Sequence, residues 1–146
     1  AQAEVEEQNK GLVKRMYEAG EKGDIEALKE IYSPDYVWYM PSNSPKPMSL
    51  EETIEFEKMV RIAFPDVNFS IEDIIADGDK TITRFVIRGT HEGEFQGIPA
   101  TGNKIEVSGI IISRIENGKI VENKEELDRL GMMMQLGFEL KPKEEK

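Results

Sequence analysis

The first part of the chain places apolar and small side chains three or four residues apart, which is the pattern of an amphipathic helix. Asp24 is a typical N-cap for a second helix, and Ser49 with Glu52 forms the capping-box pair that starts a third. Pro65 ends the third helix, because the residue before a proline avoids helical backbone angles. Three N-terminal helices are therefore predicted, over residues 5–20, 24–32 and 49–64.

From Asp66 onward, apolar and polar side chains alternate, which predicts β-strands with one buried face. Asn117-Gly118 is a strong hairpin signal, because both central residues of a type I′ turn need a positive φ. Asp77-Gly78-Asp79 marks an earlier turn. Strands are expected over residues 67–71, 82–87, 104–115 and 119–127, with a short earlier strand at 37–40, an irregular loop at 41–48 and a brief last helix at 128–136.

Helices followed by a long antiparallel meander predict an α+β fold. We expect a curved antiparallel sheet, in effect a cone-shaped α+β barrel, packed around the three N-terminal helices. Side chains near the wide end of such a cone cannot fill it, so a ligand pocket is expected there. Residues 1–137 are expected to form one domain, and the charged tail 138–146 is expected to fray.

Composition excludes several classes of function. The 146 residues include no cysteine and a single histidine, which excludes thiolate chemistry and a poly-histidine metal centre. Only carboxylates could hold a metal, and none are suitably spaced, so no metal is expected. The net charge of -10 and the lack of a basic stripe argue against nucleic acid as a partner. No apolar run approaches the ~20 residues of a membrane helix. Residues 1–10 hold no apolar stretch typical of a signal peptide, so a cytoplasmic location is expected.

Several blocks of sequence resemble the SnoaL-like polyketide cyclases of the nuclear transport factor 2 superfamily. The resemblance covers roughly residues 9 to 137. The blocks are RGTHEGEFQGIPATG at 88–102, NGKIVE at 117–122, DIEAL at 24–28, AFPD at 63–66, DRLG at 128–131 and QLG at 135–137. The resemblance implies ring closure by intramolecular aldol condensation without metal or cofactor, with an acidic side chain on the last strand as general acid/base. It also implies a homodimer.

The resemblance assigns the acid/base role to Glu125. Many relatives read Glu-His-Trp-Asp or Glu-His-Trp-Glu where this chain reads Glu122-Asn123-Lys124-Glu125, so the carboxylate is kept while the His and Trp are replaced. Alternation places Asn123 and Glu125 on the inner face of the strand. A carboxylate held among apolar side chains has a raised pKa, which suits it to remove a proton from carbon next to a carbonyl. The alternative is that Glu125 is one more solvated acid.

Four further polar residues have both a functional and a structural interpretation. Asn123 could bind a substrate carbonyl or orient Glu125, or it could satisfy backbone groups at the sheet rim. His91 is a candidate catalytic residue near the pocket entrance, or a hydrogen-bonded structural residue. Arg84 could neutralise a substrate enolate or pair with an acid across the sheet. Lys124 should point away from the pocket, although a buried lysine beside Glu125 would suit Schiff-base chemistry.

Aromatic and thioether side chains are the expected pocket wall, because flat rings and flexible thioethers suit a hydrophobic polycyclic ligand. The alternative for each is an ordinary core position. One sulfur of residues 132–134 is expected at the pocket mouth or at a subunit contact. The expected substrate-binding residues include the charged Arg84 beside these side chains. They are Tyr17, Trp38, Tyr39, Met40, Met59, Arg84 and Phe85.

Two kinds of function remain open at this point. The first is a cofactor-free cyclase or isomerase in which Glu125 transfers a proton on a carbonyl-bearing substrate, while Asn123 or Tyr39 donates a hydrogen bond to the enolate. The second is a protein of the same fold that binds a small hydrophobic molecule without chemistry. An epoxide-opening hydrolase ranks last, because the sequence offers no Asp-Arg-Asp cluster.

Overall fold

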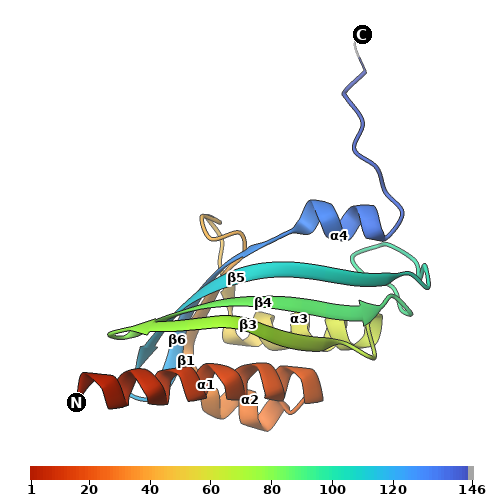
Figure 1. Ribbon diagram of the computed structural model, residues 1–146. Coiled ribbons are helices and arrows are strands. Elements are labelled where there is room, and N and C mark those ends of the chain that lie inside the picture. Colours follow the sequence, from red (N-terminus) through yellow and green to blue (C-terminus); the bar gives the residue numbers. More distant parts are fainter. Residues whose placement is uncertain (145–146) are drawn as a thin grey trace.

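The computed structural model describes residues 1–144, in which a curved, unclosed sheet of six strands packs against helices (Figure 1). The strand order across the sheet is β2-β1-β6-β5-β4-β3. The helices are α1 (Gln2–Lys22), α2 (Ile25–Ile31), α3 (Leu50–Ala63) and α4 (Arg129–Gln135). The strands are β1 (Tyr32–Tyr39), β2 (Met48–Ser49), β3 (Asn68–Asp77), β4 (Lys80–Thr90), β5 (Lys104–Glu116) and β6 (Lys119–Leu127). The predicted α+β class with a curved sheet against the helices is confirmed.

The helix ends follow the local signals in the sequence. Asp24 accepts a hydrogen bond from the Ala27 N–H and caps α2, while Ser49 and Glu52 form both bonds of the capping box that starts α3. Asp128 caps α4 through the Gly131 N–H. Each cap satisfies a backbone donor that the first helical turn leaves unpaired, so the predicted starts of α2, α3 and α4 are confirmed, whereas α1 starts at Gln2 rather than at residue 5.

The two predicted hairpin turns are also present. Asn117 and Gly118 have φ values of 51° and 74°, so the residues between β5 and β6 adopt the left-handed region that a tight turn requires. Gly78, with φ of 63°, turns the chain between β3 and β4. These turns set the antiparallel β3-β4 and β5-β6 pairs.

The N-terminal part of the sheet differs from the prediction. β1 starts at Tyr32 rather than Val37 and pairs in parallel with β6, so the sheet is not wholly antiparallel. A parallel pairing is possible because β1 and β6 are far apart in the chain and need no hairpin between them. β2 lies at the end of the segment expected to be an irregular loop and pairs with β1. The tail from residue 138 has no helix or strand up to residue 144, and residues 145–146 lie outside the described part.

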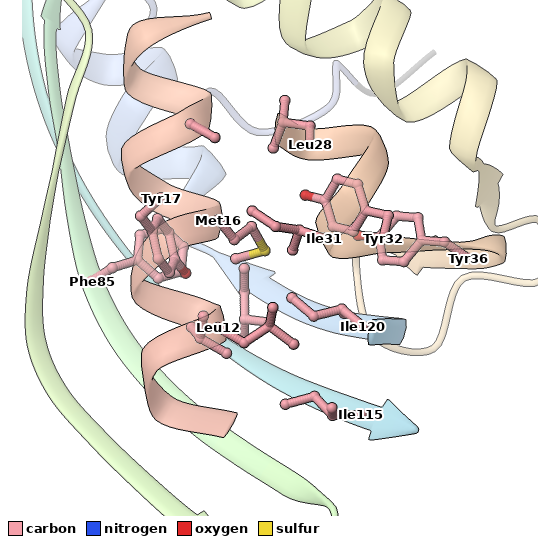
Figure 2. Close-up of a cluster of buried hydrophobic side chains, with 13 residues drawn as sticks. Leu12, Met16, Tyr17, Leu28, Ile31, Tyr32, Tyr36, Phe85, Ile115 and Ile120 are labelled. Atoms are coloured by element: carbon pink, nitrogen blue, oxygen red, sulfur yellow. The ribbon is translucent and has the colours of Figure 1, made fainter. Parts of the chain in front are cut away.

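Two clusters of buried side chains fill the space between the sheet and the helices. In the first, Tyr17 of α1 lies beside Phe85 of β4, with ring centres 5.5 Å apart (Figure 2). On the other side of Met16, the rings of Tyr32 and Tyr36 stack at 4.1 Å. The second cluster lies near α4 and the end of α3, and Phe69, Ile87 and Leu127 pack against both clusters. None of the helices in residues 1–144 combines the length and apolarity needed to cross a membrane.

Candidate active site

A partly open cavity lies between α1, α3 and the inner face of the sheet. It has a volume of about 130 Å³, and most of its wall is aromatic or aliphatic. Two carboxyl groups interrupt this wall, those of Glu57 on α3 and Glu125 on β6. Apolar residues of the wall include Met16, Trp38, Met40, Phe56, Phe69 and Phe85. Arg61 and Arg129 also line it, so the cavity is an apolar space with both acidic and basic residues in its wall.

Glu125 points into this cavity and is 4% exposed. Alternation along β6 places it on the same face as Asn123, as the sequence indicated. The Trp38 indole N–H donates a hydrogen bond to Oε1 of Glu125 at 3.2 Å. Burial is the main cause of a raised pKa of about 8 for Glu125; the Trp38 hydrogen bond and the charge of Arg129 oppose the shift, and the nearby Glu57 adds to it. Glu125 can therefore exchange a proton close to neutral pH.

Glu57 is a second carboxyl at the cavity that the sequence analysis missed. The Tyr32 hydroxyl donates a hydrogen bond to its Oε1 at 3.4 Å, and burial raises the pKa of Glu57 to about 7. Its other oxygen, Oε2, is buried and has no hydrogen-bond partner within residues 1–144. Helical spacing could have found it, because Glu57 lies three residues after Ile54 and three before Val60, on the buried side of α3.

Tyr17 brings an unpaired hydroxyl to the same cavity. Its ring lies between those of Phe69 and Phe85, at 5.6 and 5.5 Å, and its hydroxyl is buried with no partner among the described residues. Burial, and then the charge of Glu125, raise the pKa of Tyr17 well above its ordinary value. The hydroxyl therefore keeps its proton and can donate a hydrogen bond to a ligand.

Asn123 has its polar atoms engaged with other side chains. Its Oδ1 accepts a hydrogen bond from the Ser113 hydroxyl at 2.5 Å. Its amide nitrogen donates to the Tyr36 hydroxyl at 2.9 Å and to the Met16 sulfur at 3.5 Å. These bonds connect β6 with β5, β1 and α1. The Asn123 amide thus links these elements at the cavity wall. Its partners are side chains, not the backbone groups at the sheet rim that the sequence suggested.

The fold and this cavity can be compared with known proteins. Residues 11–136 match the family model of the SnoaL-like polyketide cyclases. The chain belongs to this family. The predicted membership is confirmed, and it implies the nuclear transport factor 2-like superfamily.

Relatives of the chain carry more than one description. The aklanonic acid methyl ester cyclase DnrD of Streptomyces peucetius is 28% identical over 137 residues, which cover 86% of this chain and 88% of the relative. The crystal structure of IdmH from Streptomyces antibioticus, a candidate polyketide cyclase, is 33% identical with a TM-score of 0.78, covering 90% and 99% of the two chains. AclR from Streptomyces galilaeus, a candidate hydroxylase, is 26% identical with a TM-score of 0.80, covering 94% and 98%. Family membership alone therefore does not specify the chemistry at this cavity.

Several residues expected at the site of this SnoaL-like protein do line the cavity. Tyr17, Trp38, Met40 and Phe85 form part of its wall, together with Glu125 and Asn123. Met132 also reaches the wall, whereas Met134 is 55% exposed. Lys124 points away from the cavity, as expected, and its Nζ lies 5.6 Å from the centre of the Tyr39 ring.

Three residues expected to line the pocket lie elsewhere. Tyr39 follows Trp38 on β1, so alternation puts it on the outer face of the sheet beside Lys124. Met59 is 48% exposed on the outer side of α3. Arg84 pairs with Asp73 across the β3-β4 pair, with 2.8 Å between Nε and Oδ2. The alternative interpretation of Arg84, an acid partner across the sheet, is the one the structure matches.

His91 also lies outside the cavity wall. It is fully buried just after β4, where its ring stacks on Phe64 at 5.3 Å. Nδ1 accepts a hydrogen bond from the Thr101 N–H at 3.2 Å and lies 2.9 Å from the Thr101 hydroxyl oxygen. These contacts tie the two ends of the loop between β4 and β5 together, which matches the structural interpretation of His91.

The acidic side chains of the described residues do not form a metal site. Within residues 1–144, no group of three or more His, Asp and Glu side chains is arranged to hold a metal ion.

Proposed function

We propose that this protein is a cofactor-free cyclase or isomerase that transfers a proton on a hydrophobic, carbonyl-bearing substrate, with Glu125 as the acid/base. The observation that carries the proposal is the enclosure of the Glu125 carboxyl in an apolar cavity, where burial raises its pKa to about 8. A general base works best when its pKa lies near the working pH. The relative DnrD is named as an aklanonic acid methyl ester cyclase, and the matched family model is that of SnoaL-like polyketide cyclases, which together support a polyketide-like substrate.

Ring closure in this proposal starts with ionised Glu125. Its carboxylate takes a proton from the carbon next to a carbonyl group, and the electron pair of the broken C–H bond forms an enolate. The enolate carbon attacks a second carbonyl of the same molecule, which forms the new C–C bond and an alkoxide. Glu125 then returns its proton to the alkoxide, so the product is a cyclic β-hydroxy ketone and the enzyme is restored.

Tyr17 is the proposed donor to the enolate oxygen. Its buried hydroxyl has no partner among the described residues, and its raised pKa keeps it protonated. A fixed donor in an apolar site stabilises developing negative charge more than the initial carbonyl, which lowers the barrier. Asn123 and Tyr39, the donors considered from the sequence, are less suited, because Asn123 is engaged with Ser113 and Tyr36 and Tyr39 lies on the outer face.

Replacing Glu125 with Gln tests the proposal directly. The amide keeps the size of the side chain but cannot take a proton, so turnover is expected to fall by about 10²–10⁴-fold. Turnover is measured by liquid chromatography and mass spectrometry, with aklanonic acid methyl ester as the first probe. Glu126→Gln is the matched control, because Glu126 is the neighbouring acid on β6 and is exposed. A loss below tenfold in Glu125→Gln would contradict the role of general base.

The pH dependence of turnover provides a second check on the same proposal. The active form of Glu125 is the carboxylate, so kcat/KM should rise with pH and level off above about pH 8. The Glu126→Gln control should keep this profile. A profile that is flat between pH 6 and 9 would be inconsistent with proton removal by Glu125.

A further inference from the structure

Glu57 has an unpaired oxygen at the cavity wall that plays no part in the proposed acid/base step. Oε1 of Glu57 accepts a hydrogen bond from the Tyr32 hydroxyl, whereas Oε2 is buried at the cavity wall and has no hydrogen-bond partner within residues 1–144. A buried carboxylate oxygen without a donor costs free energy, and native structures almost always satisfy such atoms. A ligand in this cavity is in a position to supply the missing donor.

The neighbouring side chains have other partners. The Trp38 N–H donates to Glu125, and the Asn123 amide donates to Tyr36 and Met16. Two arginines of the wall also have acceptors, since Arg61 donates to the Glu21 carbonyl and Arg129 to the Gln96 side chain. No donor among the described residues reaches Oε2, so the contents of the cavity are in a position to supply one.

We infer that Glu57 is a specificity-determining residue that accepts a hydrogen bond from a hydroxyl group of the ligand through Oε2. An ionised carboxylate only accepts hydrogen bonds, so it selects a hydroxyl and gains nothing from a carbonyl or an ether. The bond to a charged acceptor is also stronger than one between neutral groups. The inference rests on the proposed function in one respect, namely that the substrate occupies this same cavity.

The unpaired groups together define a class of substrate. Tyr17 offers a donor, which suits a carbonyl oxygen, and Glu57 offers an acceptor, which suits a hydroxyl. The expected ligand is thus an aromatic molecule that carries both a carbonyl and a hydroxyl group.

Two bicyclic probes test this inference by isothermal titration calorimetry at pH 7.5. 1-Naphthol carries a hydroxyl donor, whereas 1-methoxynaphthalene keeps the oxygen but has no donor. The protein is expected to bind 1-naphthol about tenfold more tightly than 1-methoxynaphthalene, because one hydrogen bond to a charged group is made or lost. Equal binding of naphthol and its methyl ether would overturn the inference.

Variants of α3 assign the preference to Glu57. In Glu57→Gln, the amide oxygen can still accept from Tyr32 while the NH₂ group faces the cavity, so the preference for 1-naphthol should fall to within about twofold. Glu55→Gln is the matched control, because Glu55 lies on the same helix, is exposed and pairs with Lys58. It should keep the full preference. A preference that persists in Glu57→Gln would overturn the assignment.

The binding experiment separates this inference from the acid/base proposal. It measures affinity without turnover, so a normal rate in Glu125→Gln would leave the naphthol result unaffected. Loss of turnover in Glu125→Gln together with no naphthol preference would retain the catalytic role of Glu125 and reject the hydroxyl contact at Glu57. Circular dichroism of Glu57→Gln verifies folding, and the probe comparison in the unaltered protein needs no variant.

Discussion

Two glutamates face one small apolar cavity and differ in their hydrogen-bond partners. The Trp38 indole N–H donates a hydrogen bond to Glu125, and the Tyr32 hydroxyl donates one to Glu57. Both carboxyls have a raised pKa because burial disfavours the charged form, and for Glu125 the neighbouring Glu57 adds to the shift. At the scale of the residue, the chemistry therefore depends on how each carboxyl is enclosed rather than on the residue type, since most other acids of this chain lie on the surface.

Tyr17→Phe tests the role of a single hydroxyl at this scale. The ring contacts with Phe69 and Phe85 are kept, while the proposed donor to the enolate oxygen is lost. We expect kcat to fall by about 10²-fold, as for removal of one oxyanion donor. The melting temperature should be unchanged or slightly higher, because the hydroxyl has no partner among the described residues. Unchanged kcat would reject Tyr17 as the donor.

At the scale of elements, the parallel pairing of β1 with β6 assembles the site. Trp38 lies opposite Asn123 in the register, so its indole reaches Glu125 two residues further along β6. A register shift between Arg114 and Ile115 of β5 lies opposite the start of β6, where Ile120 is buried in the core. Beyond this bulge, alternation directs Asn123 and Glu125 inward.

Asn123→Ala tests whether this residue holds the elements together. The change leaves the buried Ser113 and Tyr36 hydroxyls without their partner, so the free energy of unfolding should fall by about 1–3 kcal/mol. Urea denaturation followed by circular dichroism measures the change. Asn68→Ala, at an exposed position on β3, is the control and should change it by less than about 0.5 kcal/mol. Equal stability of the two variants would argue against the structural role.

At the scale of the whole molecule, the buried acids link stability to pH. The folded state raises the pKa values of Glu57 and Glu125 to about 7 and about 8, above the ordinary value of 4.5. The folded protein therefore binds these protons more tightly than the unfolded chain. Their contribution to stability is complete below about pH 4.5 and is lost as the pH rises through 7 and 8.

The expected homodimer stays a prediction, which sedimentation equilibrium would test.

The double variant Glu57→Gln/Glu125→Gln should remove this link. Its unfolding free energy at pH 9 should exceed that of the unaltered protein by roughly 3 kcal/mol or more, because no buried charge forms. The difference should shrink toward pH 5, where both carboxyls are protonated in the folded state. Urea denaturation at a series of pH values measures it, with Glu55→Gln/Glu126→Gln as the exposed control pair. Parallel curves for the double variant and the control would contradict the raised pKa values.

The order of the elements and most of their ends could be predicted from the sequence. Caps at Asp24, Ser49 and Asp128 and the turn at Asn117-Gly118 act through bonds and backbone angles of adjacent residues, so local sequence is enough to place them. The inward direction of Glu125 follows from alternation, because successive side chains of a strand point to opposite faces.

The tertiary structure alone decided which of these elements meet. Periodicity shows which face of an element is buried, but not against which partner, because any apolar face can cover another. The parallel β1-β6 pair and the approach of Glu57 to the cavity of Glu125 depend on such partners. Arg84 and Tyr39 lie on the outer face by strand alternation, next to the inward Phe85 and Trp38. The sequence by itself determined the strand that carries the acid, and only the pairing of β1 with that strand and the packing of α3 on β1 enclosed the carboxyl and raised its pKa.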